Sequence, residues 1–237
     1  METSSILPPL RHYFGEARLA GDWLRGRLSE DVLASRWPGD GRTVIVVPGL
    51  FTTDSRTALL RRVLKKAKYD VHGWGLGRNM PVRANTLDRF DAHVIDCGQG
   101  QPVALVGWSL GGIIAREYAK VKPDQVSQVI TLGSPFSGDV RDNRAWRFYE
   151  LAADHKVDAA PLMTDRSGKP PVPTTAIWSR RDGIVAAHSA RGAANERDTA
   201  IEISCGHLAM SSAPDAIEAV LKALASLPAK AVPAGNV

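Results

Sequence analysis

The sequence predicts an α/β fold in which a mostly parallel sheet of about six strands carries helices on both faces. Three observations favour it. Short apolar runs alternate with helical patterns along most of the chain. The chain has 237 residues, which is enough to bury a substantial core. A serine flanked by glycines lies between one apolar run and the helical pattern after it.

Apolar runs with β-branched residues are expected to form the strands, at residues 43–47, 69–73, 103–106, 126–132, 174–179 and 200–204. Helical patterns fit between most of these runs, at about residues 55–68, 83–94, 109–121 and 213–226. Because strands that alternate with helices form one parallel sheet, residues 41–228 are expected to be a single domain.

Residues 1–40 read as helices and loops that pack on this domain. Within them, residues 10–28 predict an amphipathic helix, whose apolar residues lie close to one face: Leu10, Phe14, Ala17, Trp23, Leu24 and Leu28. Arg11, Arg18 and Arg25 recur on another face. We expect the apolar face to dock onto the body, with weak contact to an anionic membrane surface as the alternative.

Residues 136–172 are too long for an ordinary connection and are expected to form a small lid. Aromatic residues at positions 146, 148 and 149 favour that interpretation. Residues 229–237 are rich in proline and alanine and are expected to be disordered.

The stretch Gly107-Trp108-Ser109-Leu110-Gly111 has the pattern Gly-x-Ser-x-Gly. Between a strand and a helix, this pattern makes a sharp turn that exposes the serine as a nucleophile. The glycines accept backbone angles that other residues avoid. A serine at a helix start is also a common N-cap, so the rest of the chain has to decide between the two.

Candidate partners for Ser109 follow two other expected strands. Asp182 lies just after residues 174–179, and His207 just after residues 200–204. A neutral imidazole activates a serine hydroxyl, and a carboxylate orients the imidazole. Asp182 alone would be an ordinary Asp-Gly turn residue and His207 an ordinary loop residue. Their joint position at strand ends, in the order serine, acid, histidine, favours a catalytic triad.

The loop after the first expected strand, which begins with Pro48-Gly49, is the candidate oxyanion loop, although Gly49 also fits an ordinary turn. We expect the oxyanion donors to be the backbone N–H of Leu110 and that of either Leu50 or Phe51. Four residues are candidate substrate contacts: Arg78, Asn79, Trp108 and Trp146. Arg78 and Asn79 fit a structural turn equally well.

Six segments together resemble the lipase-like serine esterases of the α/β-hydrolase superfamily, over about residues 43–225: "VPGLFTTD", "GWGLGRN", "LVGWSLGGIIARE", "ITLGSPF", "SRRDGIV" and "CGHLAM". The resemblance implies that Ser109 is the nucleophile, Asp182 the acid and His207 the base, with residues 48–51 as the oxyanion loop. It also implies that the first two strands of the larger superfamily sheet are absent. Many secreted lipases have histidine before the oxyanion-loop glycine and before the nucleophile. This chain has Pro48 and Trp108 there, so an acyl ester is favoured over emulsified fat.

The net charge of +5 gathers largely on one expected helix, at Arg56, Arg61, Arg62, Lys65, Lys66 and Lys68. We interpret it as a solvated helix face and expect no nucleic-acid partner. The six histidines have no HxxxH or HxH spacing, so neither a metal site nor a cofactor is expected. With no export signal, a cytoplasmic protein with two free cysteines is expected.

These patterns predict a carboxylic ester hydrolase that acts on a small acyl ester or a lipid through an acyl-enzyme. An acyltransferase or a thioesterase would use the same triad. A binding protein that kept the fold without the activity is a third alternative.

Overall fold

The computed structural model describes residues 7–139, 143–144, 146–153, 156 and 168–227. The tail expected at 229–237 and much of the lid expected at 136–172 lie outside these residues. Their predicted roles therefore stay predictions.

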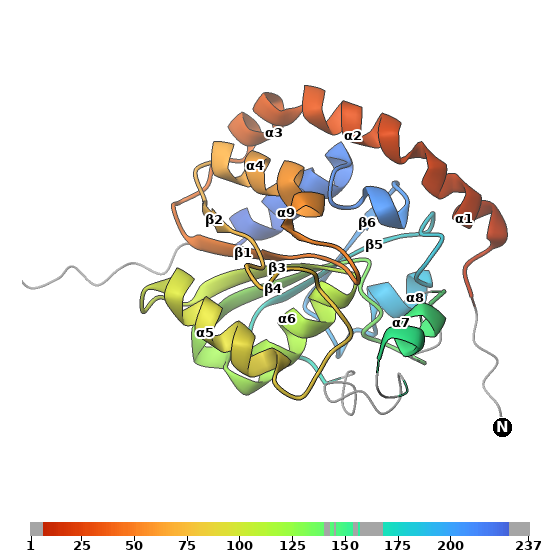
Figure 1. The fold of residues 1–237 in the computed structure, drawn as a ribbon. Helices are drawn as coiled ribbons and strands as arrows, with labels where there is room; N and C mark the ends of the chain where they lie inside the picture. The colour runs from red at the N-terminus through yellow and green to blue at the C-terminus, as the bar shows by residue number, and fades with distance from the viewer. Residues whose placement is uncertain (1–6, 140–142, 145, 154–155, 157–167, 228–237) are drawn as a thin grey trace, which may run out of the picture.

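The described residues form a six-stranded sheet with all strands parallel, in the order β2-β1-β3-β4-β5-β6 (Figure 1). This confirms the predicted sheet. The strands are β1 (Thr43–Val47), β2 (Asp70–His72), β3 (Val103–Trp108), β4 (Val126–Leu132), β5 (Thr174–Ser179) and β6 (Thr199–Ile203). Strand β3 continues two residues beyond its expected end because Gly107 and Trp108 still pair with β4.

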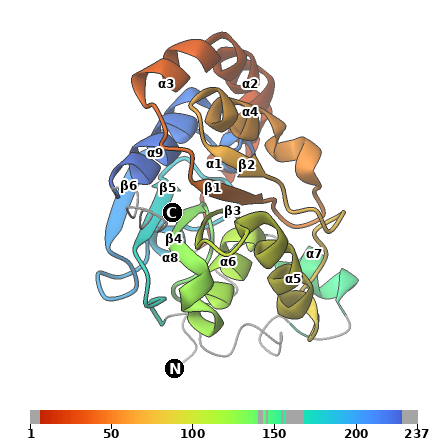
Figure 2. The same ribbon diagram turned by 90° about the vertical axis from the view of Figure 1, so that its left-hand side faces the viewer.

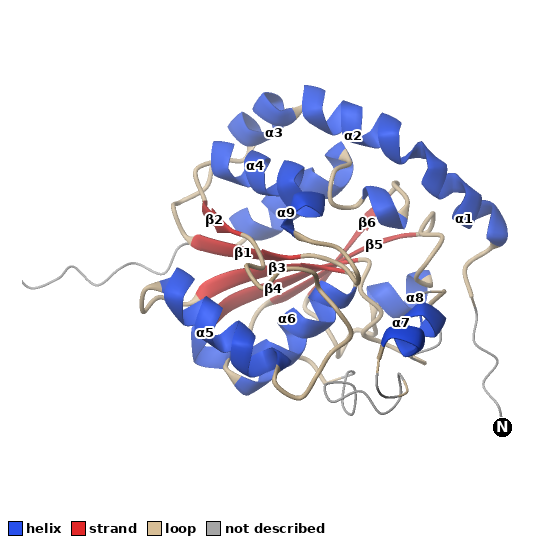
Figure 3. Ribbon diagram, in the orientation of Figure 1, coloured by secondary structure: helices blue, strands red, loops and turns tan. Residues whose placement is uncertain are grey.

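Helices cover both faces of the sheet, as the blue and red layers of Figure 3 show. On one face lie α2 (Leu19–Leu28), α3 (Glu30–Arg36), α4 (Ala58–Lys66) and α9 (Pro214–Ala225). On the other lie α5 (Thr86–Gly98) and α6 (Leu110–Val121), together with the short α7 (Trp146–Ala152) and α8 (Ala187–Arg191). Figure 2 shows the same layers turned by 90°. The sequence pattern did not predict α8.

The core has two parts, one on each side of the sheet. Alternate residues of β1 point into different parts: Val44 and Val46 into the cluster under α4 and α9, Ile45 and Val47 into the cluster under α5 and α6. A strand alternates its side chains between faces, so a strand buried on both faces must be apolar throughout. This explains the continuous apolar runs of the sequence.

The N-terminal residues form α1 (Leu10–Gly15), the 3₁₀ turn η1 (Glu16–Arg18), α2 and α3, which run across α9 and the 3₁₀ turn η5 (His207–Ala209) (Figure 1, red). The predicted apolar face is wrong for α2: Trp23, Leu24 and Leu28 are 46%, 53% and 77% exposed. The side chains of Leu10, Phe14 and Ala17 lie outside the description. No helix in the described part of the chain has both the length and the apolar character needed to span a bilayer.

Polar contacts explain why α2 and its neighbours present the opposite face to the body. The buried residues here include Glu16, Asp22, Gly26 and Glu30. At Gly26 the helix approaches the backbone so closely that an added Cβ would lie 2.0 Å from the Ser212 carbonyl oxygen. Glu30 forms ion pairs with side chains of α4. The segment is thus attached by charge and close backbone approach, which a hydrophobic pattern cannot reveal.

Candidate active site

Ser109 occupies a strained turn between β3 and α6, with φ 54° and ψ −121°. A positive φ is uncommon for a residue with a side chain, and such strain gathers at functional sites. Two glycines make the turn physically feasible. A Cβ on Gly107 would lie 2.4 Å from the Gly111 carbonyl oxygen, and one on Gly111 would lie 2.3 Å from the Val47 carbonyl oxygen.

Asp182 and His207 form a buried pair, although they come from separate strand ends. The Asp182 Oδ2 lies 2.7 Å from the His207 Nδ1. The other oxygen, Oδ1, accepts hydrogen bonds from the backbone N–H groups of Ile184 and Val185, at 2.8 and 2.7 Å. A carboxylate only accepts hydrogen bonds, so the imidazole carries its proton on Nδ1 and leaves Nε2 as an acceptor.

The charge around His207 favours its protonated form. Burial opposes a charged imidazole, but the charge and hydrogen bond of Asp182, together with the charge of Glu16, raise the pKa of His207 above its usual value. His207 is therefore a stronger base than a free histidine, which is what proton abstraction from a hydroxyl requires.

Three structural links bring the Ser109 turn and this pair to one edge of the sheet. The Ser109 N–H donates to the Leu132 carbonyl at the end of β4, 2.8 Å away. A Cβ on the next residue, Gly133, would lie 3.0 Å from the His207 Nδ1 and 3.1 Å from the Asp182 Oδ2. Trp108 donates from Nε1 to the His207 carbonyl, at 3.2 Å. Among the described residues, the Ser109 hydroxyl has no hydrogen-bond partner.

The loop after β1 is held by the residues expected to line the pocket. Asn79 is buried and donates from Nδ2 to the Pro48 carbonyl, at 2.6 Å, and from its N–H to the Thr52 carbonyl, at 2.8 Å. Arg78 donates from Nη1 to the Phe51 carbonyl, at 2.7 Å. These contacts favour the structural-turn alternative for both residues.

The same contacts separate the two candidate oxyanion donors in this loop. The Phe51 N–H donates to the Asn79 carbonyl at 2.7 Å, so it is occupied. The Leu50 N–H has no acceptor within the described part of the chain. Leu110 lies in the first turn of α6, where backbone N–H groups lack intrahelical acceptors. The backbone N–H groups of Leu50 and Leu110 therefore remain the candidate oxyanion donors, and that of Phe51 does not.

The two tryptophans proposed as substrate contacts lie in different surroundings. Trp108 is buried, its ring centroid lies 5.8 Å from that of His207, and the Arg56 guanidinium carbon lies 5.6 Å from the Trp108 ring centroid. It supports the loop that carries His207, called the histidine loop below, and it has little exposed surface for contact with a substrate. Trp146, in α7, is half-buried against the core cluster under α5 and α6.

Glu16 belongs to this site, and sequence reasoning missed it. Its Oε1 accepts hydrogen bonds from the backbone N–H groups of Gly183, at 3.0 Å, and His207, at 2.8 Å. Its Oε2 accepts from the Leu208 N–H at 2.8 Å. Glu16 lies 167 and 191 residues from Gly183 and His207 along the chain, so no local pattern could indicate these contacts.

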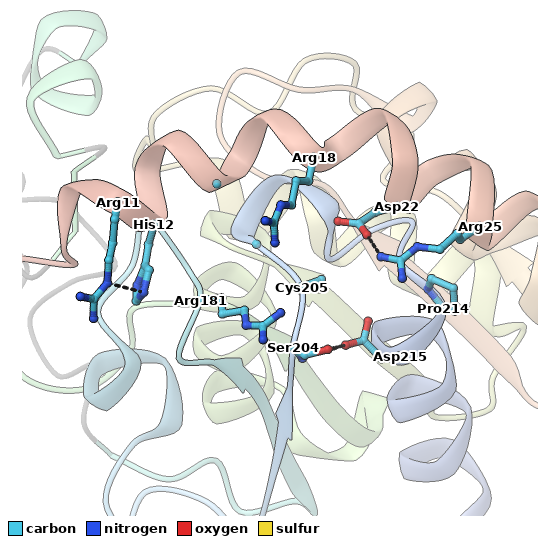
Figure 4. Close-up of a pocket in the computed structure, with 12 residues that line it drawn as sticks. Arg11, His12, Arg18, Asp22, Arg25, Arg181, Ser204, Cys205, Pro214 and Asp215 are labelled. Atoms are coloured by element: carbon cyan, nitrogen blue, oxygen red, sulfur yellow. Dashed lines mark hydrogen bonds and ion pairs between the residues drawn. The ribbon is translucent and has the colours of Figure 1, made fainter.

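A cavity of about 450 Å³ lies beside the site, between the N-terminal helices and the end of β6 (Figure 4). Arg18 and Arg181 point into it, and Asp22 within it pairs with Arg25. Neither Ser109 nor the His207 side chain lines this cavity, so it is separate from the candidate catalytic residues. The described residues hold no cluster of histidine, cysteine or acidic side chains arranged to bind a metal ion.

Two curated proteins match parts of the chain. Polyketide synthase ThaQ of Burkholderia thailandensis is 37% identical over 92 residues, which are 36% of this chain and 4% of that protein. The pimeloyl-[acyl-carrier protein] methyl ester esterase of Aliivibrio salmonicida is 29% identical over 102 residues, or 32% of this chain and 38% of that protein. The chain thus matches well under two thirds of either relative.

Solved structures match over most of the chain. A monoacylglycerol lipase of Paleococcus ferrophilus has a TM-score of 0.59 and 16% identity, over 80% of this chain and 96% of that one. The thioesterase domain from the curacin biosynthetic pathway has a TM-score of 0.58 and 14% identity, over 80% and 93%. At such identities the likeness shows the fold.

The family model described as the alpha/beta hydrolase fold matches residues 84–158, a stretch that contains the Ser109 turn. The all-parallel sheet and the solved structures agree with this match. The chain therefore has the α/β-hydrolase fold, and the proteins that it resembles include lipases and esterases.

Proposed function

We propose that the chain is a carboxylic ester hydrolase in which Ser109 is the nucleophile, His207 the general base and acid, and Asp182 the orienting carboxylate. One observation carries the proposal. The strained Ser109 turn and the buried 2.7 Å pair of His207 and Asp182 meet at the same edge of the sheet. A binding protein without activity would have no use for a strained serine beside a basic, oriented imidazole.

The reaction proceeds in two halves. The Ser109 hydroxyl oxygen attacks the ester carbonyl carbon while the His207 Nε2 takes its proton, and the backbone N–H groups of Leu50 and Leu110 bind the oxyanion. The carbon–oxygen bond to the alcohol then breaks, the alcohol leaves with the proton from His207, and an acyl-serine remains. Water attacks this acyl group in the same way, which releases the carboxylic acid and restores Ser109.

The substrate class follows from the neighbours only as far as acyl esters. One solved neighbour is a monoacylglycerol lipase and one curated relative is a methyl ester esterase. A second candidate is thioester hydrolysis, because the curacin thioesterase domain has nearly the same TM-score as the lipase. Both reactions use the same nucleophile and differ in the leaving group.

The test is a hydrolysis panel of p-nitrophenyl esters from acetate to palmitate, with an acyl thioester added. We expect measurable turnover of at least one chain length, and labelling of Ser109 by a fluorophosphonate at neutral pH. Ser109→Ala should lose the labelling and lower kcat by at least about 10³-fold. Folded wild-type protein that resists the fluorophosphonate and hydrolyses no substrate of the panel would contradict the proposal.

We also propose weak contact between the N-terminal helices and an anionic membrane surface. The support is the outer face of α2 and α3, where Trp23, Leu24, Leu28 and Val32 are exposed. Arg25 and Arg27 lie between these apolar residues along the chain. Sedimentation with anionic liposomes tests it: binding that salt weakens and Trp23→Ser abolishes is expected, and no binding at low salt would contradict it. A cytoplasmic location stays a prediction, to be tested by cell fractionation.

A further inference from the structure

Glu16 binds both loops that carry the candidate acid and base. Its carboxylate accepts three backbone hydrogen bonds, one from the loop after β5 at Gly183 and two from η5 at His207 and Leu208. Glu16 is buried, so its carboxylate is the acceptor that these N–H groups have within the protein. Removing it would leave these donors without their acceptor, which would destabilise both loops.

The histidine loop leaves room for this carboxylate at Gly206. A Cβ added to Gly206, just before His207, would lie 2.8 Å from the Glu16 Oε2 and 3.0 Å from its Cδ. A side chain at position 206 would therefore push Glu16 away from the loop. Glycine here allows the close approach that three short hydrogen bonds to one carboxylate require.

Glu16 lies where the N-terminal helices meet the loop that carries His207. The cavity beside it separates much of α1 and α2 from the end of β6, and its lining includes Gly15 and Gly206 (Figure 4). The large apolar residues Trp23 and Leu24 point to solvent. Apolar packing of Ala209 and Met210 holds the His207 loop on the core, and the hydrogen bonds of Glu16 tie this loop to the loop that carries Asp182.

We propose that Glu16 is a positioning residue for the Ser109 site: its carboxylate fixes the loops that carry Asp182 and His207 relative to each other. The charge of Glu16 also favours the protonated state of His207. This inference rests on the proposed function. Glu16 does not touch the substrate in this scheme. It holds His207 at the height and angle at which Nε2 serves Ser109, and it helps Asp182 to stabilise the imidazolium formed during each half-reaction.

Charged groups from several elements face the His207 loop. Asp215 accepts hydrogen bonds from Ser204 at the start of the loop, and Arg18, Asp22 and Arg181 line the cavity beside Cys205 and Gly206. Asp182 pairs with the imidazole, Glu16 binds the backbone, and Arg56 donates from Nη2 to the Leu208 carbonyl at 2.5 Å. Cys205 lies in the same loop, but burial raises the pKa of its thiol, so it stays neutral. Of these groups, Asp182 and Glu16 are the ones whose charges act on the imidazole of His207.

The test compares Glu16→Gln with Glu30→Gln. Both replace a buried carboxylate of the N-terminal segment with a neutral amide, but Glu30 pairs with Arg62 and Lys66, away from His207. In Glu16→Gln the amide nitrogen faces a backbone N–H where an oxygen accepted before, so at least one hydrogen bond is lost. We expect kcat/KM to fall about 10- to 100-fold, and the acid limb of its pH profile to move to lower pH by about half a unit to one unit. Glu30→Gln should lower Tm without changing kcat/KM or the acid limb of its pH profile.

A second measurement does not depend on activity. In the Ser109→Ala background, the imidazole titration of His207 is followed by NMR and assigned by loss of its signal in His207→Gln. We expect a lower His207 pKa in Glu16→Gln and an unchanged one in Glu30→Gln. Glu16→Asp, which keeps the charge but shortens the reach, should leave the His207 titration in this background nearly unchanged. With Ser109 present, the turnover of Glu16→Asp should fall. Glu16→Asp also tests the inference if Glu16→Gln does not fold.

The outcomes separate this inference from the proposed function. If the wild type hydrolyses esters but Glu16→Gln keeps its kcat/KM, pH profile and His207 titration, Glu16 is only structural and the inference is overturned. An unchanged His207 titration overturns it equally when the wild type proves inactive. A wild type that neither labels nor hydrolyses overturns the ester hydrolase proposal, while the NMR comparison still decides whether Glu16 acts on His207.

Discussion

The two halves of the candidate active site are built in different ways. The Ser109 turn depends on space: its backbone passes so close to α6 and β1 that the glycines at 107 and 111 cannot carry a side chain. The pair of Asp182 and His207 depends on hydrogen-bond partners supplied from far along the chain, with Glu16 on both loops. Added atoms should therefore disrupt the serine half, whereas removal of a charge or of a hydrogen-bond acceptor should disrupt the histidine half.

The largest effect is expected from Gly107→Ala, which adds one methyl group to the serine half. Its Cβ would lie 2.4 Å from backbone atoms of Gly111 and Gly112, and backbone gives way less easily than a flexible side chain. We expect loss of at least about 3 kcal/mol of stability and of all measurable turnover. Urea unfolding measures the loss of stability, and ester hydrolysis measures the loss of turnover.

Gly21→Ala is the matched control for that substitution. A Cβ on Gly21, within α2, meets nothing within 4 Å. Alanine is the better helix former, so stability should rise by about 0.5–1 kcal/mol with activity unchanged. If Gly107→Ala behaved like Gly21→Ala, the close packing described for the serine half would be wrong.

Asp182→Asn is expected to have the next largest effect, since it removes a charge from the histidine half without changing its shape. The asparagine no longer holds the imidazole in the required tautomer or balances its developing charge. We expect kcat to fall by about two to four orders of magnitude in a folded protein. Asp154→Asn and Asp158→Asn are the controls, because both acids lie in the expected lid, outside the described residues. A large loss at either one, with near-normal turnover in Asp182→Asn, would overturn the assignment of the acid.

A smaller effect is expected at Asn79, which holds the loop after β1. Asn79→Ala removes the bond to the Pro48 carbonyl and leaves the main-chain bonds to Phe51 and Thr52. The loosened loop should misplace the Leu50 N–H and lower kcat about 10- to 100-fold, with KM nearly unchanged. Asn85→Ala, at an exposed position with no cap bond, should leave kcat as it is. An unchanged kcat in Asn79→Ala would argue against Leu50 as an oxyanion donor.

The comparison also explains how far the sequence could predict this molecule. The serine half is local, so the Gly-x-Ser-x-Gly stretch between an apolar run and a helical pattern suggested the turn, although Asp182 and His207 were needed to favour it over an N-cap serine. The apolar runs were enough to predict the sheet. Asp182 and His207 were found because both follow strands, although their 2.7 Å pairing needed the structure. Glu16 could not be found, because a buried carboxylate and an exposed one look alike in an amphipathic segment. The orientation of α2 was mispredicted for the same reason: polar contacts at Gly26 and Glu30 outweigh the apolar pattern.

The smallest effect is expected from the pH dependence set by His207, which belongs to the histidine half alone. Its pKa is raised above the ordinary value of 6.5 by Asp182 and Glu16 against the opposing effect of burial. Catalysis needs the neutral imidazole, so kcat/KM should fall as the pH drops through this raised pKa, up to about tenfold for each unit below it. The serine half contains no group that titrates there.

Stability should change in the opposite direction over the same range. A histidine whose pKa is raised by folding stabilises the folded protein fully below its unfolded pKa, and this contribution is lost as the pH rises through the folded pKa. Between about pH 6.5 and the raised value, activity should therefore increase with pH while the contribution of His207 to Tm decreases. The difference in Tm between the wild type and His207→Gln, measured across this range, isolates that contribution. A difference that stays constant or grows with pH would show that the charges of Asp182 and Glu16 do not favour protonated His207.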